Sequence, residues 1–199
     1  MWGVQLRMGL GSQATRRSAL ESSSGDTAFI DVAVVDGASN VPYWVQGVEN
    51  ATGAVTITAS APGFTDGTNT ITIVQPGIIL SGLTATSTVG AVDDSFYAQI
   101  GTPSGGSVNV QSIRAGGTPV TVDFTTTDAG VGLLTDGQTS GSTVSAVIPV
   151  LTFRTPTTVA TGGTAHDPVG VGTATINATT NAAGVISQPN ATRTVTINP

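Results

Sequence analysis

The hydrophobic and polar positions of this chain follow the same pattern in two places far apart in the sequence. In GAVTITASAPGFTDGTNTITIVQPG, residues 53–77, Val55 and Ile57 alternate with threonines, and Ile71 and Ile73 do so again after a stretch rich in Pro and Gly. A period of two places successive side chains on opposite faces of a strand. The stretch therefore predicts a β-hairpin with one buried face and one hydroxyl-rich solvent face.

The pattern returns at the end of the chain in GTATINATTNAAGVISQPNATRTVTINP, residues 172–199, where Ile176 and Val195 lie among alternating threonines. Both copies close at a proline, Pro76 and Pro199, and a proline cannot continue the hydrogen-bonded ladder of a strand. The copies are offset by about 120 residues, which indicates an internal repeat. The sequence therefore predicts two domains in series.

Between the two copies, short strand candidates recur at nearly regular intervals, separated by clusters of Gly, Pro, Ser and Asp. They are residues 78–86, 95–101, 107–115, 119–127, 142–153 and 157–165. Together with the terminal hairpin they make about seven or eight strands, the number in a complete β-sandwich. We therefore assign residues 77–199 to one complete sandwich module.

Residues 26–76 contain only about four strand candidates, roughly half a sandwich. A sheet of that size buries too little apolar surface to be stable alone. We therefore predict a partial module that is completed by residues 1–25, by the neighbouring domain, or by a strand that another chain donates. Residues 1–25 are then either this completing segment or a leader, flexible or with a short helix through Gln13 to Glu21.

Composition agrees with an all-β fold and narrows the range of partners. The chain has no Lys and only two glutamates, whereas β-branched residues are frequent. Its net charge of −6 would repel phosphate backbones, so we expect no nucleic-acid partner. No apolar run approaches the ~18–20 residues that a membrane-spanning helix needs. Without cysteine there is also no disulfide framework.

Three stretches carry a resemblance to a known family: VTITASAPGFTDGTNTITIV, DDSFYAQIGTPSGGSVNVQSIRAGGTPVTVDF and VATGGTAHDPVGVGTATINATTNAAG. Through them, residues 27–199 resemble the tandem immunoglobulin-like repeat modules of very large bacterial surface and secreted proteins. The resemblance implies spacer, stalk or adhesive modules and brings no catalytic residues. It leads us to expect tandem immunoglobulin-like β-sandwiches, the first of them incomplete.

Candidate catalytic and metal-binding residues are few. His166 is the only histidine, and Asp167 follows it directly. Adjacent residues on a strand point to opposite faces, which disfavours a joint catalytic or metal-binding role. We interpret TAHDPVG as a turn at a strand end.

Five aspartates are candidates for a calcium site at a module junction, because hard cations prefer carboxylate and carbonyl oxygens. They are Asp93, Asp94, Asp123, Asp128 and Asp136. No DxDxDG loop is present, and the first two fit equally well as an exposed turn before Ser95. We therefore expect no cofactor, with calcium as the alternative.

The densest aromatic spot is Tyr43 and Trp44 in NVPYWVQG. Exposed, these rings could stack on sugars or on a partner; buried, at least one of them would anchor a core that has few other large side chains. We name both as candidate ligand or partner contacts and expect one ring in the core.

These observations predict a non-enzymatic extracellular structural protein: a stalk, fibre or sheath module at a bacterial cell surface. Its expected partners are other copies of itself or neighbouring immunoglobulin-like modules, with assembly by strand exchange as the more specific form of the hypothesis. The alternative is an adhesin or a carbohydrate-binding module, for example on a phage particle, with a glycan as partner.

Overall fold

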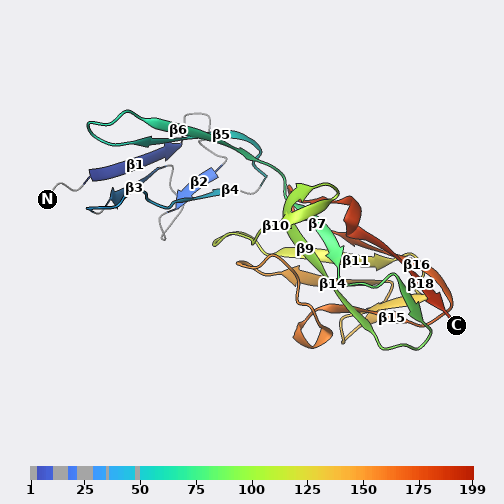
Figure 1. Cartoon of the computed structure of the whole chain (residues 1–199). Helices are drawn as coiled ribbons and strands as arrows, with labels where there is room; N and C mark the ends of the chain where they lie inside the picture. The colour runs from blue at the N-terminus through green and yellow to red at the C-terminus, as the bar shows by residue number, and fades with distance from the viewer. Residues whose placement is uncertain (1–3, 11–17, 22–28, 35, 48–49) are drawn as a thin grey trace. The chain divides into compact units, whose positions relative to one another are not determined.

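The computed structural model describes residues 4–10, 18–21, 29–34, 36–47 and 50–199, and these form an all-β protein, as predicted (Figure 1). The chain divides into two compact units, Met1–Val74 and Gln75–Pro199. This boundary lies close to the one expected from the sequence at residue 77. Each unit is described by itself.

The N-terminal unit contains a four-stranded antiparallel sheet and a two-stranded one. The order of the larger sheet is β3-β1-β5-β6, and β2 pairs with β4 in the smaller sheet. The strands are β1 (Val4–Leu10), β2 (Ser18–Glu21), β3 (Phe29–Val34), β4 (Trp44–Gly47), β5 (Gly53–Ser60) and β6 (Gly67–Ile73). Among the described side chains of this unit, Ile30, Val55 and Ile57 are buried, and Ile30 and Ile57 pack together against partly buried neighbours such as Val45 and Ile71.

Strand β1 lies in the middle of the larger sheet. Met8 pairs with Ile30 of β3 on one side and with Ala59 of β5 on the other. The beginning of the chain therefore supplies the strand that joins β3 to the β5–β6 hairpin. A helix reaching Glu21 is wrong, because that residue ends the strand β2.

The hairpin of residues 53–77 forms as expected, with Val55 and Ile57 buried and the threonines outward. Thr56 faces Thr70, with their hydroxyl oxygens 3.3 Å apart. The terminal copy has the same feature on β16 and β18, but it is not a simple hairpin, because a short strand and a 3-10 turn lie between them.

The C-terminal unit is a sandwich of two sheets. One sheet has the order β13-β12-β15-β9-β7-β17, with β10 added on β9, and the other has the order β14-β11-β16-β18-β8. The first contains β7 (Gly77–Ser81), β9 (Asp94–Ser104), β10 (Ser107–Val110), β12 (Gly132–Thr135), β13 (Ser140–Gly141), β15 (Thr164–Pro168) and β17 (Ile186–Ser187). The second contains β8 (Thr86–Thr88), β11 (Val120–Thr126), β14 (Thr143–Ile148), β16 (Gly172–Thr179) and β18 (Thr192–Asn198).

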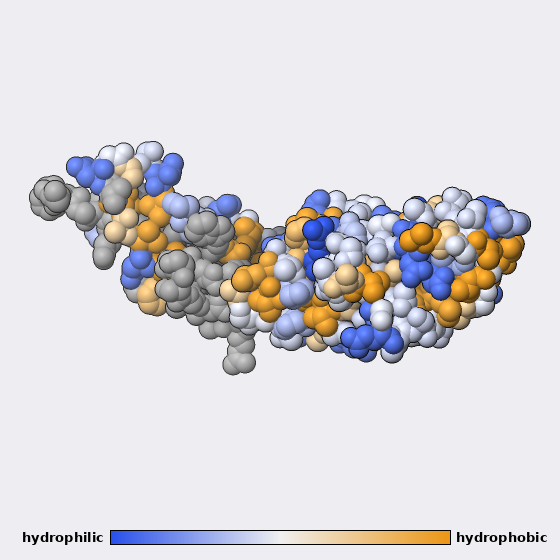
Figure 2. All heavy atoms as spheres, turned by 90° about the horizontal axis from the view of Figure 1, so that it is seen from below, coloured by the Kyte–Doolittle hydropathy of each residue, from blue (hydrophilic) through white to orange (hydrophobic). Residues whose placement is uncertain are grey.

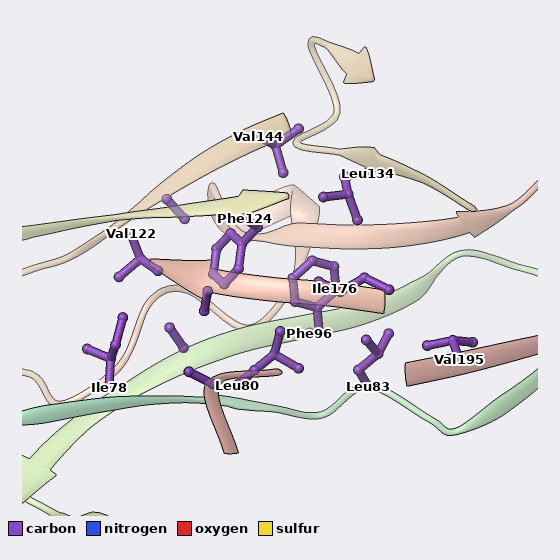
Figure 3. Packing of buried hydrophobic residues seen from close by; sticks show 14 of the residues in the cluster. Ile78, Leu80, Leu83, Phe96, Val122, Phe124, Leu134, Val144, Ile176 and Val195 are labelled. Atoms are coloured by element: carbon purple, nitrogen blue, oxygen red, sulfur yellow. The ribbon is translucent and has the colours of Figure 1, made fainter. Parts of the chain in front are cut away.

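The core of this unit lies between the two sheets (Figure 3). Alternate residues of each long strand point inward, as Phe96 and Ala98 do on β9 and Val122 and Phe124 on β11. The rings of Phe96 and Phe124 meet edge to face, with centroids 5.1 Å apart. Such aromatic pairs contribute about 0.5–1.5 kcal/mol beyond the area they bury.

The stretch predicted as one strand over 78–86 divides between the two sheets. Strand β7 ends at Ser81, Gly82 adopts the left-handed conformation with φ of 91°, and β8 continues in the opposite sheet. There β8 runs parallel to the last strand, with Thr86 beside Thr196. A glycine adopts this backbone conformation without steric cost, which explains the sharp break.

Three further stretches differ from the sequence-based prediction. Strand β14 ends before Pro149 instead of reaching residue 153, and the 3-10 turn η2 (Val159–Thr161) interrupts the stretch expected as a strand at 157–165, where β15 begins only at Thr164. Strand β12 was not predicted, because its sequence GLLT shows no alternation. Its inward residue Leu134 is fully buried, so tertiary packing determines this strand.

Candidate functional site

The predicted aromatic contact lies at the start of β4. Tyr43 is 38% exposed and immediately precedes the strand, and Trp44 is its first residue. The Trp44 side chain lies outside the described part of the structure. A role for this pair in binding therefore stays a prediction.

His166 is in the middle of β15, so the prediction of a turn at this position is wrong. It pairs with Leu134 on one side and Asp94 on the other, and only 1% of its surface is exposed. Its Nε2 atom has no hydrogen-bond partner among the described residues, and any side chain at Gly132 would overlap that atom. Glycine at 132 thus leaves the space that the imidazole ring fills.

Burial lowers the pKa of His166, and the nearby carboxylates of Asp94, Asp167 and Asp93 act in the opposite direction. Burial lowers the pKa because the low-polarity interior disfavours the charged imidazolium. A buried neutral histidine between two sheets has no access to a substrate. It therefore acts in packing and in the pH dependence of stability.

The five candidate calcium ligands do not come together as one group. Within the part of the chain that the structure describes, no three acidic or histidine side chains form a group that could hold a metal ion. Asp94 accepts hydrogen bonds from the Thr84 backbone and hydroxyl at 2.8 and 2.7 Å, and Asp123 accepts one from Ser145 at 2.6 Å. Asp136 likewise organises its own turn, where bonds from the backbone N–H groups of Thr139 and Gln138 lower its pKa.

The outer face of the seven-stranded sheet carries a cluster that the sequence analysis did not identify. The side chain of Arg154 lies over two rings, with its guanidinium carbon 5.7 Å from the centroid of Tyr97 and 5.4 Å from that of Phe153. Arg154 pairs with Gln99 through an isolated antiparallel bridge. We call Tyr97, Gln99, Arg154 and Ser81 together the Arg154 platform.

Part of this platform could be predicted from the sequence. In SFYAQIG, residues 95–101, the inward positions are apolar, so alternation places Tyr97 and Gln99 outward. The position of Arg154 could not be predicted from the sequence, because it depends on a bridge between residues 55 apart in the chain.

The outer face of the five-stranded sheet is rich in hydroxyl groups. Across β16 and β18, Thr173 faces Thr196, Thr175 faces Thr194 and Asn177 faces Thr192. The last two pairs are hydrogen-bonded, at 3.2 and 3.0 Å. The threonines of the terminal repeat therefore form a solvent face, as the alternation predicted.

Apolar side chains gather at the end of the C-terminal unit where β18 stops (Figure 2). They are Val89, Val92, Val169 and Val171, between 38% and 91% exposed. Their loops are joined by hydrogen bonds from Val89 N–H to the Asn198 carbonyl and from Gly90 N–H to the Pro168 carbonyl. Contiguous exposed apolar groups of this kind often mark contacts with other molecules.

The chain is similar to several solved structures at low sequence identity. No protein-family model matches it, and neither does any curated protein. It is similar to domains 4 and 5 of the S-layer protein SbsC, with 10% identity, a TM-score of 0.37, and 94% of this chain and 72% of that chain covered. It is also similar to the Yersinia pseudotuberculosis adhesin InvE, with 13% identity, a TM-score of 0.39, and coverage of 100% and 50%.

Red sea bream transglutaminase is a third similar structure, at 14% identity, a TM-score of 0.29, and coverage of 99% and 27%. All three TM-scores are below 0.5, and the functional proposal for this protein therefore rests on its own residues. The described residues contain no helix long and apolar enough to cross a membrane.

The buried state of His166 predicts a specific pH dependence of stability. Because its pKa is lowered in the folded protein, the unfolded chain binds more protons below its own histidine pKa of ~6.5. The contribution of His166 to stability should therefore be constant above that pH and decrease as the pH falls below it, by at most about 1.4 kcal/mol per pH unit for one proton.

Urea denaturation at pH 7.5 and 5.5 measures this effect, with His166→Gln as the comparison. The decrease between the two pH values should be present in the wild-type protein and absent in the variant. An equal decrease in both proteins would assign it to other groups.

Proposed function

We propose that this protein is a non-enzymatic structural module of an extracellular assembly, a stalk, fibre or sheath subunit of a bacterial surface. The observation that carries the proposal is that the chain enters and leaves the C-terminal sandwich at opposite ends. The path from Gly77 to Thr88 runs along the unit through β7 and β8, and Thr88 lies beside Asn198, the last residue of β18. Modules connected in this way suit arrangement in series.

The pairing of β8 with β18 suits such a module to tension. The two strands are parallel and lie side by side, and β8 comes near the start of the unit in sequence whereas β18 is its last strand. Tension applied at both ends pulls β8 and β18 in opposite directions along their axes. The hydrogen bonds that cross between them, including Thr196 N–H to the Ala85 carbonyl at 2.9 Å, are then loaded together in shear and not one after another.

Surface chemistry also supports an exposed, non-enzymatic role. The rows of threonine and asparagine on β16 and β18 present hydroxyl and amide groups to solvent. The chain has no cysteine, and its single histidine is buried in the core. A serine–histidine or cysteine–histidine pair would therefore lack either its thiol or an accessible imidazole base.

Assembly by strand exchange is the more specific form of the proposal. Strand β1 is at the beginning of the chain, yet it joins β3 to β5 in the middle of its sheet. A strand in this position can be supplied equally well by the same segment of another copy, because the hydrogen bonds and register are identical. Repeated exchange in one direction would connect copies into a fibre.

The shear geometry predicts how the C-terminal unit responds to force. Val89→Pro removes the N–H group that donates to the Asn198 carbonyl at 3.0 Å, whereas Val89→Ala retains it. In single-molecule stretching of the full chain between its ends, the proline variant should unfold its C-terminal unit at lower force. The alanine variant should match the wild type. Equal unfolding forces in all three proteins would argue against a load-bearing role for this pairing.

Strand exchange predicts a state of association that depends on β1. The wild-type protein should form fibres or defined oligomers of its 19.7 kDa chain, measured by light scattering and negative-stain electron microscopy. Met8→Pro removes a backbone N–H donor from β1, the strand between β3 and β5, and should abolish them, whereas Met8→Leu should preserve them. A wild-type chain that is fully folded and strictly monomeric would contradict exchange.

The alternative function is that of an adhesin or carbohydrate-binding module, on a phage particle among other settings, and the exposure of Tyr43 favours it. An exposed aromatic ring provides an apolar face with a polar edge, which suits sugar binding. In this case Tyr43→Ala and Trp44→Ala should abolish binding on a glycan array while circular dichroism stays unchanged. Full retention of binding in both variants would exclude this pair as the contact.

A further inference from the structure

The Arg154 platform is built on a rigid part of the sandwich. On β9, Phe96, Ala98 and Ile100 point into the core, so Tyr97 and Gln99 between them point outward from the sheet. Below them, core packing fixes the backbone of the strand. The outward side chains are therefore held at a constant spacing.

Arg154 is fixed on this face by its neighbours on both sides. The Ile100 N–H donates to the Phe153 carbonyl at 2.9 Å, and the Thr155 N–H donates to the Ala98 carbonyl at 3.0 Å. The Thr155 hydroxyl, itself buried, accepts a bond from the Ala98 N–H at 3.1 Å. These bonds fasten the segment around Arg154 to β9, so its exposed side chain is presented from an ordered backbone.

Tyr97 lies against the glycine that interrupts the path from β7 to β8. A Cβ atom at Gly82 would lie 3.1 Å from the Tyr97 Cε1 atom. The small residue thus lets the ring lie close to the neighbouring backbone. The guanidinium over this ring gains a cation–π contact that holds its position without neutralising its charge.

The platform presents hydrogen-bond donors more than acceptors. Ser81 donates to the Gln99 Oε1 atom at 2.9 Å, which occupies the amide oxygen and leaves the two N–H groups of the Gln99 amide directed elsewhere. Within the described part of the chain, no carboxylate forms an ion pair with Arg154. Its planar fork of N–H donors therefore keeps its capacity for an external anion.

We propose that the Arg154 platform binds a carboxylate-bearing saccharide. The guanidinium matches a carboxylate through two parallel hydrogen bonds, the Gln99 amide donates to a ring hydroxyl, and the Tyr97 ring below the guanidinium holds it in position. A site of this kind goes beyond the structural role proposed above, because it would attach the module to an acidic polysaccharide. It involves the C-terminal unit alone and is independent of strand exchange.

The net charge of the protein argues against a non-specific electrostatic attraction of polyanions. The chain has a net charge of −6, so its overall field repels a uronic acid polymer. Binding must then come from the local geometry around Arg154. Arg193, also exposed but on β18 in the other sheet, provides a matched control, because its removal changes the net charge by the same amount.

The test is calorimetric titration of the full chain with tetrasaccharides that contain glucuronate, galacturonate or mannuronate, and with the neutral tetra-N-acetylchitotetraose for comparison. At least one acidic tetrasaccharide should bind about tenfold more tightly than the neutral one. Arg154→Gln and Tyr97→Ala should each weaken that binding by about tenfold or more, whereas Arg193→Gln should leave it unchanged.

A second variant keeps the proposal testable if Arg154→Gln impairs folding. Gln99→Glu places a carboxylate beside Arg154 with little change of shape, so it should occupy the guanidinium internally and abolish binding while the thermal transition is retained. Binding of none of the acidic tetrasaccharides would overturn the proposal. Equal binding of the neutral one, or equal weakening by Arg154→Gln and Arg193→Gln, would overturn it as well.

Discussion

The parallel pairing of β8 with β18 is the contact on which the architecture of the C-terminal unit depends. It places the first part of the unit beside its last strand and completes one edge of the five-stranded sheet. Because β7 belongs to the other sheet, the same short path ties the two sheets together. Without this pairing β8 would leave the sheet, and the ends of the unit would no longer be coupled through backbone hydrogen bonds.

Core packing makes it possible for the chain to change from one sheet to the other between β7 and β8. Leu80 and Leu83 are buried on either side of Gly82, so the chain is anchored in the core immediately before and after it changes sheets. Glycine supplies the left-handed backbone at the break, and its lack of a side chain leaves room for Tyr97. One residue thus serves both the change of sheet between β7 and β8 and the position of Tyr97.

The sequence predicted those parts of the fold that local alternation determines. Strands β5, β9, β11 and β16 all show apolar residues at every second position, and each was predicted near its observed place. The division of 78–86 between two sheets was missed, because the break at Gly82 serves a tertiary contact that local propensity does not encode. The central position of β1 was one of three alternatives, since sequence cannot show which strands become neighbours.

The candidate sites were predictable to a smaller extent. Alternation placed Tyr97 outward, but Arg154 reaches it only because residues 153–155 run beside β9. The prediction of a turn at His166 was wrong because strand pairing overrides the local sequence signal. Its sequence neighbours Asp167 and Pro168 are typical of a turn, yet pairing with β12 and β9 draws all three into a buried strand.

Amide hydrogen exchange at β8 and β18 measures whether their pairing opens separately from the rest of the C-terminal unit. If the pairing is an integral part of the unit, the amides of Val89 and Thr196, which bond to Asn198 and Ala85, should exchange only through global unfolding. Their opening free energies should then equal that of Val122 in the core. Opening free energies several kcal/mol below that of Val122 would show that β8 detaches locally, which would contradict a load-bearing closure of the sandwich.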